Sequence, residues 1–325
     1  MMAQASTAMS TVRKSAPSLL QRLQQGISVP PVELIYTPHS RWPLPHSQVI
    51  HQHRNPNRPL RISILDSSFN PPTLAHLALA NSPRPRKQNS ENQDVCAYDA
   101  KLLLLSVKNA DKTLKPGDAT YQQRLEMMLL LSKDVRTDTN TEASYSLPEH
   151  EAANVAIAII DKPTFVEKSS TLLNFLQRRL TTPLQLELTF FVGLDTLERL
   201  FSPRYYPSEA DMMVLLRQFL SAAPQGDNSR IVCAKRVSSP AEAARSTETL
   251  EDSALPALAK EFTESDRVVI IDIGNVVNSY SSSAVRNAIG RFGLEQSIDQ
   301  DGGAWKSMLM NDIVDYLVEQ RLYVS

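Results

Sequence analysis

A polar turn between an apolar stretch and a short helical pattern holds the first residues that could do chemistry. Ser67, Ser68 and Phe69 begin the turn. Asn70–Thr73 then leads into a helical pattern, and His76 lies about one turn from its start. Because a helix N-terminus offers unpaired N–H groups and a partial positive charge, this segment is suited to binding phosphate. An ordinary strand–turn–helix with a surface histidine is the simpler alternative.

A second polar segment near the C-terminus has a similar arrangement. Ser281–Ser283 precede a helical pattern, Arg286 follows three residues after Ser283, and Asn278 lies just upstream. Residues three apart share one side of a helix, so the guanidinium would lie beside the serine hydroxyls. This combination suits a polyphosphate. A serine N-cap next to a solvated arginine would give the same pattern.

A third segment joins an apolar run to a helical pattern. Gly193 ends the run, and Asp195 follows within the first helical turn. An acid in this position is commonly a helix cap. It could equally accept hydrogen bonds from ligand hydroxyls, and spacing alone leaves both readings open.

Taken together, these segments resemble the signatures of the nucleotidylyltransferases. Residues 68–76 (SFNPPTLAH) resemble the motif S-F-[ND]-P-x-[TH]-x-x-H, and residues 280–286 resemble I-S-S-T-x-[IL]-R, with Tyr280 replacing isoleucine and Ser283 replacing threonine. Residues 193–195 resemble the G-[AT]-D segment of the nicotinamide mononucleotide adenylyltransferases within this superfamily. The resemblance covers residues 60–325. It departs from the pattern at Ser67, which stands where the family places glycine.

The resemblance implies a role for each matched residue. His76 and Arg286 would be catalytic and would bind the ATP phosphates, and Asp195 would accept hydrogen bonds from ribose hydroxyls. The residues that it implies for ATP binding are Ser67, Ser68, Phe69, His76, Gly193, Asp195, Asn278, Ser282, Ser283 and Arg286. Weaker correspondences on the acceptor side are Lys112 or Lys115 for a phosphate, Phe165 as the nearest aromatic residue, and Thr171.

The activity implied is transfer of AMP from ATP to nicotinamide mononucleotide, giving NAD and pyrophosphate. The acceptor phosphate would attack in line, without a covalent intermediate, since its second pKa near 6 leaves it largely ionised at neutral pH. Mg²⁺ would be held mainly by the ATP phosphates rather than by a dedicated protein metal site. Ser67 and the absence of a family tryptophan near Phe165 favour two alternatives. These are an ATP-binding or ATP-hydrolysing protein with another acceptor, and a nucleotide-binding protein with a chaperone or regulatory role.

Short apolar runs alternate with helical patterns after residue 60, which predicts the elements that position these residues. The pattern is typical of an α/β protein with a Rossmann-like, doubly wound parallel sheet and helices on both faces. The predicted strands are Arg61–Leu65, Lys101–Val107, Val155–Asp161, Leu186–Gly193, Arg230–Ala234 and Arg267–Ile273. The predicted helices are Thr73–Ala80, Thr120–Lys133, Ser170–Arg179, Thr196–Phe201, Glu209–Leu220, Ser283–Gly290 and Trp305–Gln320.

Composition excludes several other classes. The nine glycines form neither a dinucleotide-binding G-x-G-x-x-G nor a P-loop. The formal net charge of −1 argues against nucleic acid as a partner. Cys96 and Cys233 are too few for a disulfide framework, which suggests a reducing compartment. No apolar run reaches the roughly 18 residues of a membrane span, so we expect a protein of the cytoplasm or nucleus; homo-oligomer formation stays open.

The first residues differ in composition from the rest. Residues 1–60 carry six basic residues and one acidic residue, and the first thirty contain no acid. We therefore predict a basic, Ser/Pro/His-rich and partly disordered extension over residues 1–58, followed by a nucleotidylyltransferase domain over 59–325. A mitochondrial transit peptide is the alternative for the acid-free start. The histidines at 39, 46, 51 and 53 include a His-x-His pair, but no third metal ligand is evident.

Overall fold

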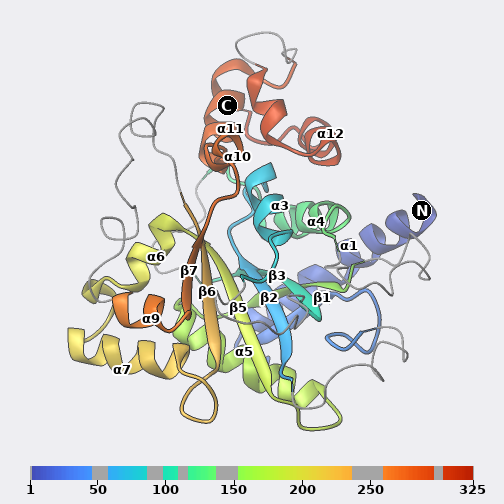
Figure 1. Cartoon of the computed structure of the whole chain (residues 1–325). Coiled ribbons are helices and arrows are strands. Elements are labelled where there is room, and N and C mark those ends of the chain that lie inside the picture. Colours follow the sequence, from blue (N-terminus) through green and yellow to red (C-terminus); the bar gives the residue numbers. More distant parts are fainter. Residues whose placement is uncertain are drawn as a thin grey trace, which may run out of the picture.

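The computed structural model describes residues 2–45, 58–85, 98–108, 116–136, 153–235, 259–295 and 303–324. Its centre is a seven-stranded sheet in the order β1-β4-β3-β2-β5-β6-β7 (Figure 1). Neighbouring strands are parallel, except that β1 runs antiparallel to β4. The strands are β1 (Val32–Tyr36), β2 (Leu60–Asp66), β3 (Ala100–Ser106), β4 (Val155–Ile160), β5 (Leu186–Gly193), β6 (Ser229–Ala234) and β7 (Val268–Ile271).

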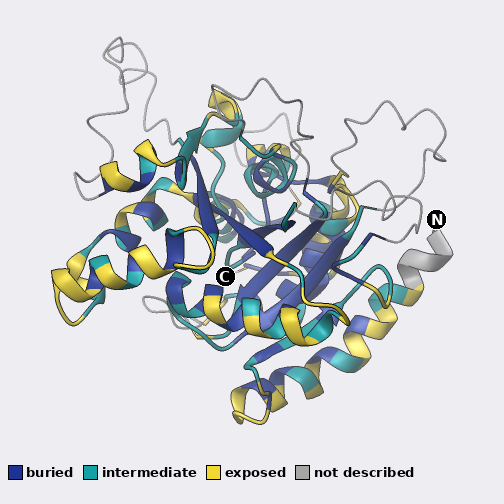
Figure 2. Ribbon diagram, turned by 60° about the horizontal axis from the view of Figure 1, so that its bottom comes forward, coloured by how far each residue is buried: buried dark blue, intermediate teal, exposed yellow. Residues whose placement is uncertain are grey.

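Both faces of the sheet are buried, because the central strands are apolar on both sides. In β2, Ile64 belongs to one hydrophobic cluster and Leu65 to the other. Leu104 and Leu103 of β3 are divided in the same way. Successive residues of a strand point to opposite faces, so continuous apolar runs require cover on each face. Figure 2 shows the strands in dark blue, beneath helices whose outer sides are exposed.

Helices supply this cover. One cluster includes side chains of α1, α3, α4, α11 and α12, and the other includes side chains of α5, α6, α7 and α9 (Figure 1). The fold is therefore a Rossmann-like, doubly wound α/β fold with helices on both faces of the sheet, as predicted. The helices are α1 (Met2–Gln24), α3 (Leu74–Ala80), α4 (Tyr121–Ser132), α5 (Phe165–Arg179), α6 (Leu194–Leu200), α7 (Glu209–Leu220), α9 (Lys260–Glu264), α10 (Asn275–Asn278), α11 (Ser282–Phe292) and α12 (Asn311–Glu319), with short 3₁₀ helices η2 (Pro203–Tyr205) and η4 (Ala304–Met308).

In the part of the chain that the structure describes, no helix has the length and hydropathy that a membrane crossing requires.

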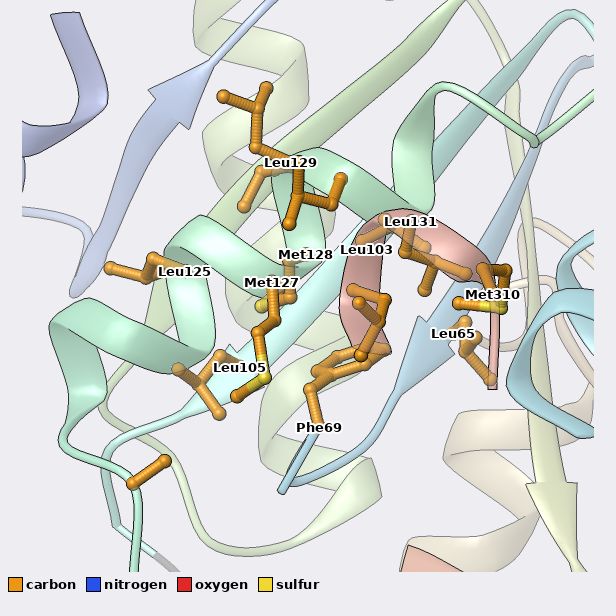
Figure 3. Close-up of a cluster of buried hydrophobic side chains, with 14 of the residues drawn as sticks. Leu65, Phe69, Leu103, Leu105, Leu125, Met127, Met128, Leu129, Leu131 and Met310 are labelled. Atoms are coloured by element: carbon orange, nitrogen blue, oxygen red, sulfur yellow. The ribbon is translucent and has the colours of Figure 1, made fainter. Parts of the chain in front are cut away.

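Helix α4 lies in the middle of one layer rather than at its surface. Eight consecutive residues, 124–131, are buried, because α4 contacts β3 and β4 on one side and α1 and α12 on the other. A helix surrounded in this way is apolar on nearly all sides. In Figure 3, Met127 and Leu131 of α4 lie with Leu103 of β3 and with Phe69 from the loop after β2. The loop that precedes α3 is thus anchored in the core.

Two of the predicted helices differ from the structure by more than two residues at an end. Helix α5 begins at Phe165 rather than Ser170, and the Thr164 hydroxyl caps it by accepting from the Glu167 backbone N–H at 3.3 Å. The predicted helix Trp305–Gln320 is two elements, η4 and α12. Met310 separates them because its backbone is extended, with φ −72° and ψ 147°.

The predicted extension over residues 1–58 requires a larger correction. Strand β1 pairs with β4 and forms an edge of the sheet. Val12, Ala16, Leu20 and Leu23 of α1 are buried in the same cluster as α4. Residues 2–45 are therefore part of the domain, because the sheet edge and α4 need this cover. The histidines at 46, 51 and 53 lie outside the described residues.

Candidate active site

A cleft of about 850 Å³ opens at the carboxyl ends of the central strands. Asp66 at the end of β2, Ser106 at the end of β3 and Gly193 at the end of β5 all line it. The chain proceeds outward from β2 through β3 to β4, and from β5 through β6 to β7, so β2 and β5 flank the topological switch point. Open α/β sheets bind ligands at this position.

Most of the site residues predicted from the sequence meet in this cleft. They come from the β2–α3 loop, from α3, from the β5–α6 junction and from the α10–α11 region. Those that line the cleft are Ser67, Ser68, His76, Phe165, Gly193, Asp195, Asn278, Ser282, Ser283 and Arg286. Lys112 and Lys115 lie outside the described residues.

Phe69 and Thr171 do not line the cleft, and both expectations were wrong for these side chains. Phe69 is 0% exposed, and its ring packs in the core with its centroid 5.6 Å from that of His76. Its φ of 45° lies in a region that a bulky residue rarely adopts. Phe69 therefore anchors the β2–α3 loop in the hydrophobic core. Thr171 is buried in the middle of α5, because the helix starts five residues earlier than the sequence suggested.

His76 is held at both ring nitrogens. The Thr73 backbone N–H donates to Nδ1 at 3.0 Å, and the Thr73 hydroxyl lies 3.0 Å from the same atom. Nδ1 must therefore be the acceptor, so the ring proton is on Nε2. Nε2 lies 2.9 Å from Ser67 Oγ. Burial lowers the pKa of His76 to about 4, and the ring is neutral at pH 7.

The two polar segments that flank this cleft contact each other directly. The Ser282 hydroxyl donates to the Pro71 carbonyl at 2.7 Å, and Arg286 donates from Nη1 to the Asn70 carbonyl at 2.5 Å. Helix α11 begins here, capped by Ser281, whose hydroxyl accepts from the Ala284 N–H at 3.1 Å. Segments that are more than 200 residues apart thus form one wall, with two helix N-termini beside each other.

Asp118 organises this wall, although the sequence did not single it out. Asn70 donates its side-chain amide to Asp118 at 2.7 Å. Arg286 and Arg124 each approach the same carboxylate at 3.6 Å. Near the C-terminus, the Tyr323 hydroxyl donates to Asn70 Oδ1 at 2.7 Å. One carboxylate therefore orients two guanidiniums and Asn70, the loop residue whose carbonyl Arg286 contacts, and no local sequence pattern marks this carboxylate.

A buried ion pair lies on the opposite side of the cleft and was also missed. Lys168 Nζ lies 2.5 Å from Asp66 Oδ2, and both side chains are 6% exposed. The ammonium also lies 4.9 Å from the ring centroid of Phe165. Phe165 and Lys168 occupy the first turn of α5, so this face depends on where α5 begins. A helical period starting at Ser170 could not have found it.

The β5–α6 junction forms a third side. Gly193 precedes α6 as its N-cap, and a Cβ at this position would meet nothing within 4 Å. Asp195 lies in the first turn of α6 and is exposed to the cleft. Asn278 donates its amide to Asp272 at 3.1 Å. An acidic acceptor and an amide thus border the space beside β5.

The cleft is suited to binding and orienting an anion rather than to attacking one with a protein nucleophile. Helix N-termini, hydroxyls and a guanidinium supply donors for phosphate oxygens. Cys233 is buried below the cleft, where burial raises the pKa of its thiol to about 12, so it is not a nucleophile at neutral pH. Within the described ranges, no three His, Cys, Asp or Glu side chains group as a metal cage.

Comparison with known proteins gives a relative in fission yeast. A Schizosaccharomyces pombe protein provisionally named nicotinamide mononucleotide adenylyltransferase is 31% identical over 231 residues, which are 70% of this chain and 75% of that protein. No family model matches the chain.

Two solved structures of Plasmodium falciparum nicotinic acid mononucleotide adenylyltransferase cover 81% of this chain, each with a TM-score of 0.42. The one complexed with NaAD is 15% identical and is covered over 97% of its length. The one complexed with APC is 14% identical and is covered over 96%.

Proposed function

The chain belongs to the nicotinamide mononucleotide adenylyltransferase family and is a nucleotidyltransferase, and from this premise we propose that it transfers AMP from ATP to nicotinamide mononucleotide, giving NAD and pyrophosphate. The contact between the loop before α3 and the start of α11 carries the proposal. Ser282 and Arg286 reach the carbonyls of Pro71 and Asn70, so two anion-binding helix ends face one cleft.

ATP takes the side of the cleft formed by β5, α6 and α11. The β- and γ-phosphates lie at the start of α11, where Ser283 and Arg286 supply donors and the Ser282 hydroxyl holds the helix start against the Pro71 carbonyl. Asp195 accepts hydrogen bonds from the ribose hydroxyls, because it is exposed to the cleft in the first turn of α6. Gly193 supports this assignment, since the space at its Cβ position is open.

The acceptor mononucleotide takes the other side, between β2 and α5. Phe165 offers an aromatic surface there, and Thr164 and Tyr121 also line the cleft. Lys168 adds a cation, which Asp66 neutralises in the absence of ligand. The acceptor phosphate then lies near the end of β2, between the pyridine ribose and the α-phosphate of ATP.

The chemistry requires positioning and charge neutralisation. An oxygen of the acceptor phosphate forms a bond to the α-phosphorus of ATP. The bond from that phosphorus to the bridging oxygen breaks, and pyrophosphate leaves with the electron pair. The acceptor is largely ionised at neutral pH, so no general base is needed. In-line orientation and donors aimed at the leaving oxygens lower the barrier.

In this proposal, Mg²⁺ would reach the cleft bound to ATP. The acidic residues that line the cleft are spread over its walls, and Asp118 and Asp66 are each paired with a cation. The donor set therefore fits an ion carried by the triphosphate and by water better than one held by protein carboxylates. None of the steps above depends on a protein-bound ion.

The experiment is an assay of the purified chain with MgATP and nicotinamide mononucleotide, following NAD and pyrophosphate together. Arg286→Gln should lower kcat/KM by about 10²–10³-fold, because it removes a cation from the developing charge. Arg291→Gln is the matched control: Arg291 lies on the same helix but is exposed over the ring of Phe292. Equal loss in both variants would contradict the assignment of Arg286.

A second candidate is a family member that binds or hydrolyses ATP without this acceptor. The contact of Ser67 with His76 favours it, because a side chain occupies a position where the family signature has glycine. ATP binding with no dinucleotide product would select this candidate. Activity with nicotinic acid mononucleotide alone would retain the reaction and change the acceptor.

A further inference from the structure

We propose that the Ser67 hydroxyl, rather than the His76 imidazole, contacts a phosphate of the bound nucleotide, and that His76 is a positioning residue that orients this hydroxyl. The inference rests on the proposed function, because it concerns the nucleotide phosphates of that site. It begins from the one position at which the β2–α3 motif departs from its signature.

The hydrogen bonds around His76 leave the ring no free donor. Nδ1 accepts from the Thr73 N–H at 3.0 Å, and this contact places the single ring proton on Nε2. Nε2 lies 2.9 Å from Ser67 Oγ, so it donates to the serine. A neutral imidazole has only one N–H, and Ser67 already uses it.

The same geometry gives Ser67 a donor to spare. A hydroxyl has one O–H and two lone pairs, and accepting from Nε2 occupies one lone pair. The O–H is then directed away from His76, and Ser67 lines the cleft. A phosphate oxygen in contact with Ser67 Oγ would be roughly 4–5 Å from Nε2, which is beyond hydrogen-bond range. Ser67 therefore stands between the imidazole and the ligand.

His76 has little freedom to bypass the serine. Thr73 is fully buried and holds Nδ1, while the ring of Phe69 packs against the imidazole with a centroid separation of 5.6 Å. The backbone of Ser67 is also fixed, because its N–H donates to the Leu104 carbonyl at 3.3 Å. Burial keeps the pKa of His76 near 4, so the ring carries no charge that would attract phosphate at pH 7.

A double-mutant cycle on Ser67 and His76 tests the inference. Ser67→Ala should lower kcat/KM for ATP by about 10–100-fold, the effect of a hydrogen bond to a charged group. His76→Ala should have a similar effect, and the double variant should be no worse than the worse single variant, because His76 acts through Ser67. Ser67→Thr keeps the hydroxyl and should restore most of the activity. Ser82→Ala, at the far end of α3 and away from the cleft, is the control serine.

Ser67→Gly adds a readout that a purely structural role of His76 would not change. It removes both the hydroxyl and its Cβ, so the Nε2 proton faces the cleft directly. We expect Ser67→Gly to be more active than Ser67→Ala. We also expect this additional activity to be lost when His76→Ala is combined with Ser67→Gly. Separate values of kcat and of KM for ATP, with circular dichroism of every variant, distinguish this from a loss of folding.

ATP binding, measured by calorimetry on the same variants, separates failure of the inference from failure of the proposed function. If the intact chain binds ATP but forms no dinucleotide, the proposed function is wrong. The role of Ser67 is then decided by the same double-mutant cycle, with the Kd for ATP measured in place of kcat/KM. The inference would be overturned if the losses in affinity or kcat/KM caused by Ser67→Ala and His76→Ala multiplied in the double variant. It would also be overturned if Ser67→Ala left both quantities unchanged. An intact chain that does not bind ATP would overturn both.

Discussion

At the scale of single residues, the proposed function assigns phosphate binding to neutral and permanently charged groups rather than to a titrating histidine. His76 accepts a backbone hydrogen bond at Nδ1, and burial keeps the ring neutral. Arg286 and Arg124 carry the positive charge of this wall, and Asp118 lies 3.6 Å from each of them. Binding should therefore vary little with the protonation of the protein near neutral pH. The phosphate of the acceptor, with a second pKa near 6, is the group that titrates there.

The His76 ring should titrate with a midpoint near pH 4 in the folded protein. Since this pKa lies below the unfolded value of about 6.5, the unfolded chain binds the proton first as the pH falls. The contribution of His76 to stability is thus complete above about pH 6.5 and is lost between pH 6.5 and 4. Nuclear magnetic resonance of the ring nitrogens measures the midpoint, and His76→Gln identifies the signal. A midpoint near 6.5 would show that desolvation does not lower the pKa of this ring.

Residues inside a continuous motif could be predicted from the sequence, and residues that act across elements could not. His76 and Arg286 were found because each belongs to a local pattern at a helix start. Asp118 and Lys168 have no such pattern, and their roles depend on partners 168 and 102 positions away in the chain. Phe69 shows the opposite error: a motif residue can be required for the core beneath the site.

At the scale of elements, a buried charge cluster ties the strands together below the cleft. Glu187 of β5 accepts two hydrogen bonds from Arg84, at 2.9 and 3.2 Å, and Arg61 of β2 lies 3.9 Å away. Burial tends to raise the pKa of Glu187, but the bonds from Arg84 and the charges of Arg84, Arg230 and Arg61 lower it overall. The carboxylate thus neutralises guanidiniums from neighbouring strands on one face of the sheet.

Glu187→Gln should destabilise the protein by roughly 3–5 kcal/mol, because it leaves buried guanidiniums without their carboxylate. The pKa of Glu187 is depressed, so its contribution is present above the unfolded pKa and is lost as the pH falls below it. The difference between wild type and variant should accordingly be largest near neutral pH and should shrink in acid. Denaturant unfolding at several pH values measures it. Glu264→Gln, which alters an exposed pair with Lys260, should change stability by less than about 1 kcal/mol.

The parallel strands could be predicted because each contains a short apolar run, and those of β3 and β4 are continuous and buried on both faces. Strand β1 could not, since Val32–Tyr36 is a short edge strand with an acid at Glu33 and only partial burial. The region 305–320 was mistaken for one helix because its apolar residues have helical spacing on both sides of the break. The extended backbone of Leu309 and Met310 separates η4 from α12.

At the scale of the whole molecule, the two ends of the chain meet on α4. Glu126 of α4 is buried, and it accepts from Arg13 of α1 at 2.9 Å and from the Tyr316 hydroxyl of α12 at 3.0 Å. Tyr323, just beyond α12, reaches Asn70 in the cleft wall. The layer formed by α1, α4 and α12 therefore connects the start of the chain to the loop that holds the candidate active site (Figure 1).

The N-terminal residues should for this reason be required for folding rather than removable. A chain lacking residues 2–37 loses β1, which exposes the edge of β4, and loses the side chains of α1 that cover α4. Each fully buried valine or leucine side chain contributes about 1.5–3 kcal/mol to the free energy of unfolding. Several together exceed what a domain with a typical stability of about 5–15 kcal/mol tolerates. We expect the deletion variant to unfold without a cooperative transition.

Point variants keep this prediction falsifiable where the deletion variant is insoluble. Leu23 is 0% exposed, and Leu23→Ala should cost about 2–5 kcal/mol in denaturant unfolding. Gln24→Ala, at the exposed neighbouring position, should have almost no effect. The mass of the protein isolated from its own cells gives an independent measurement, because a cleaved transit peptide would remove α1. A truncated mature chain, or a deletion variant with the unfolding midpoint of the intact chain, would show that residues 2–37 are an extension after all.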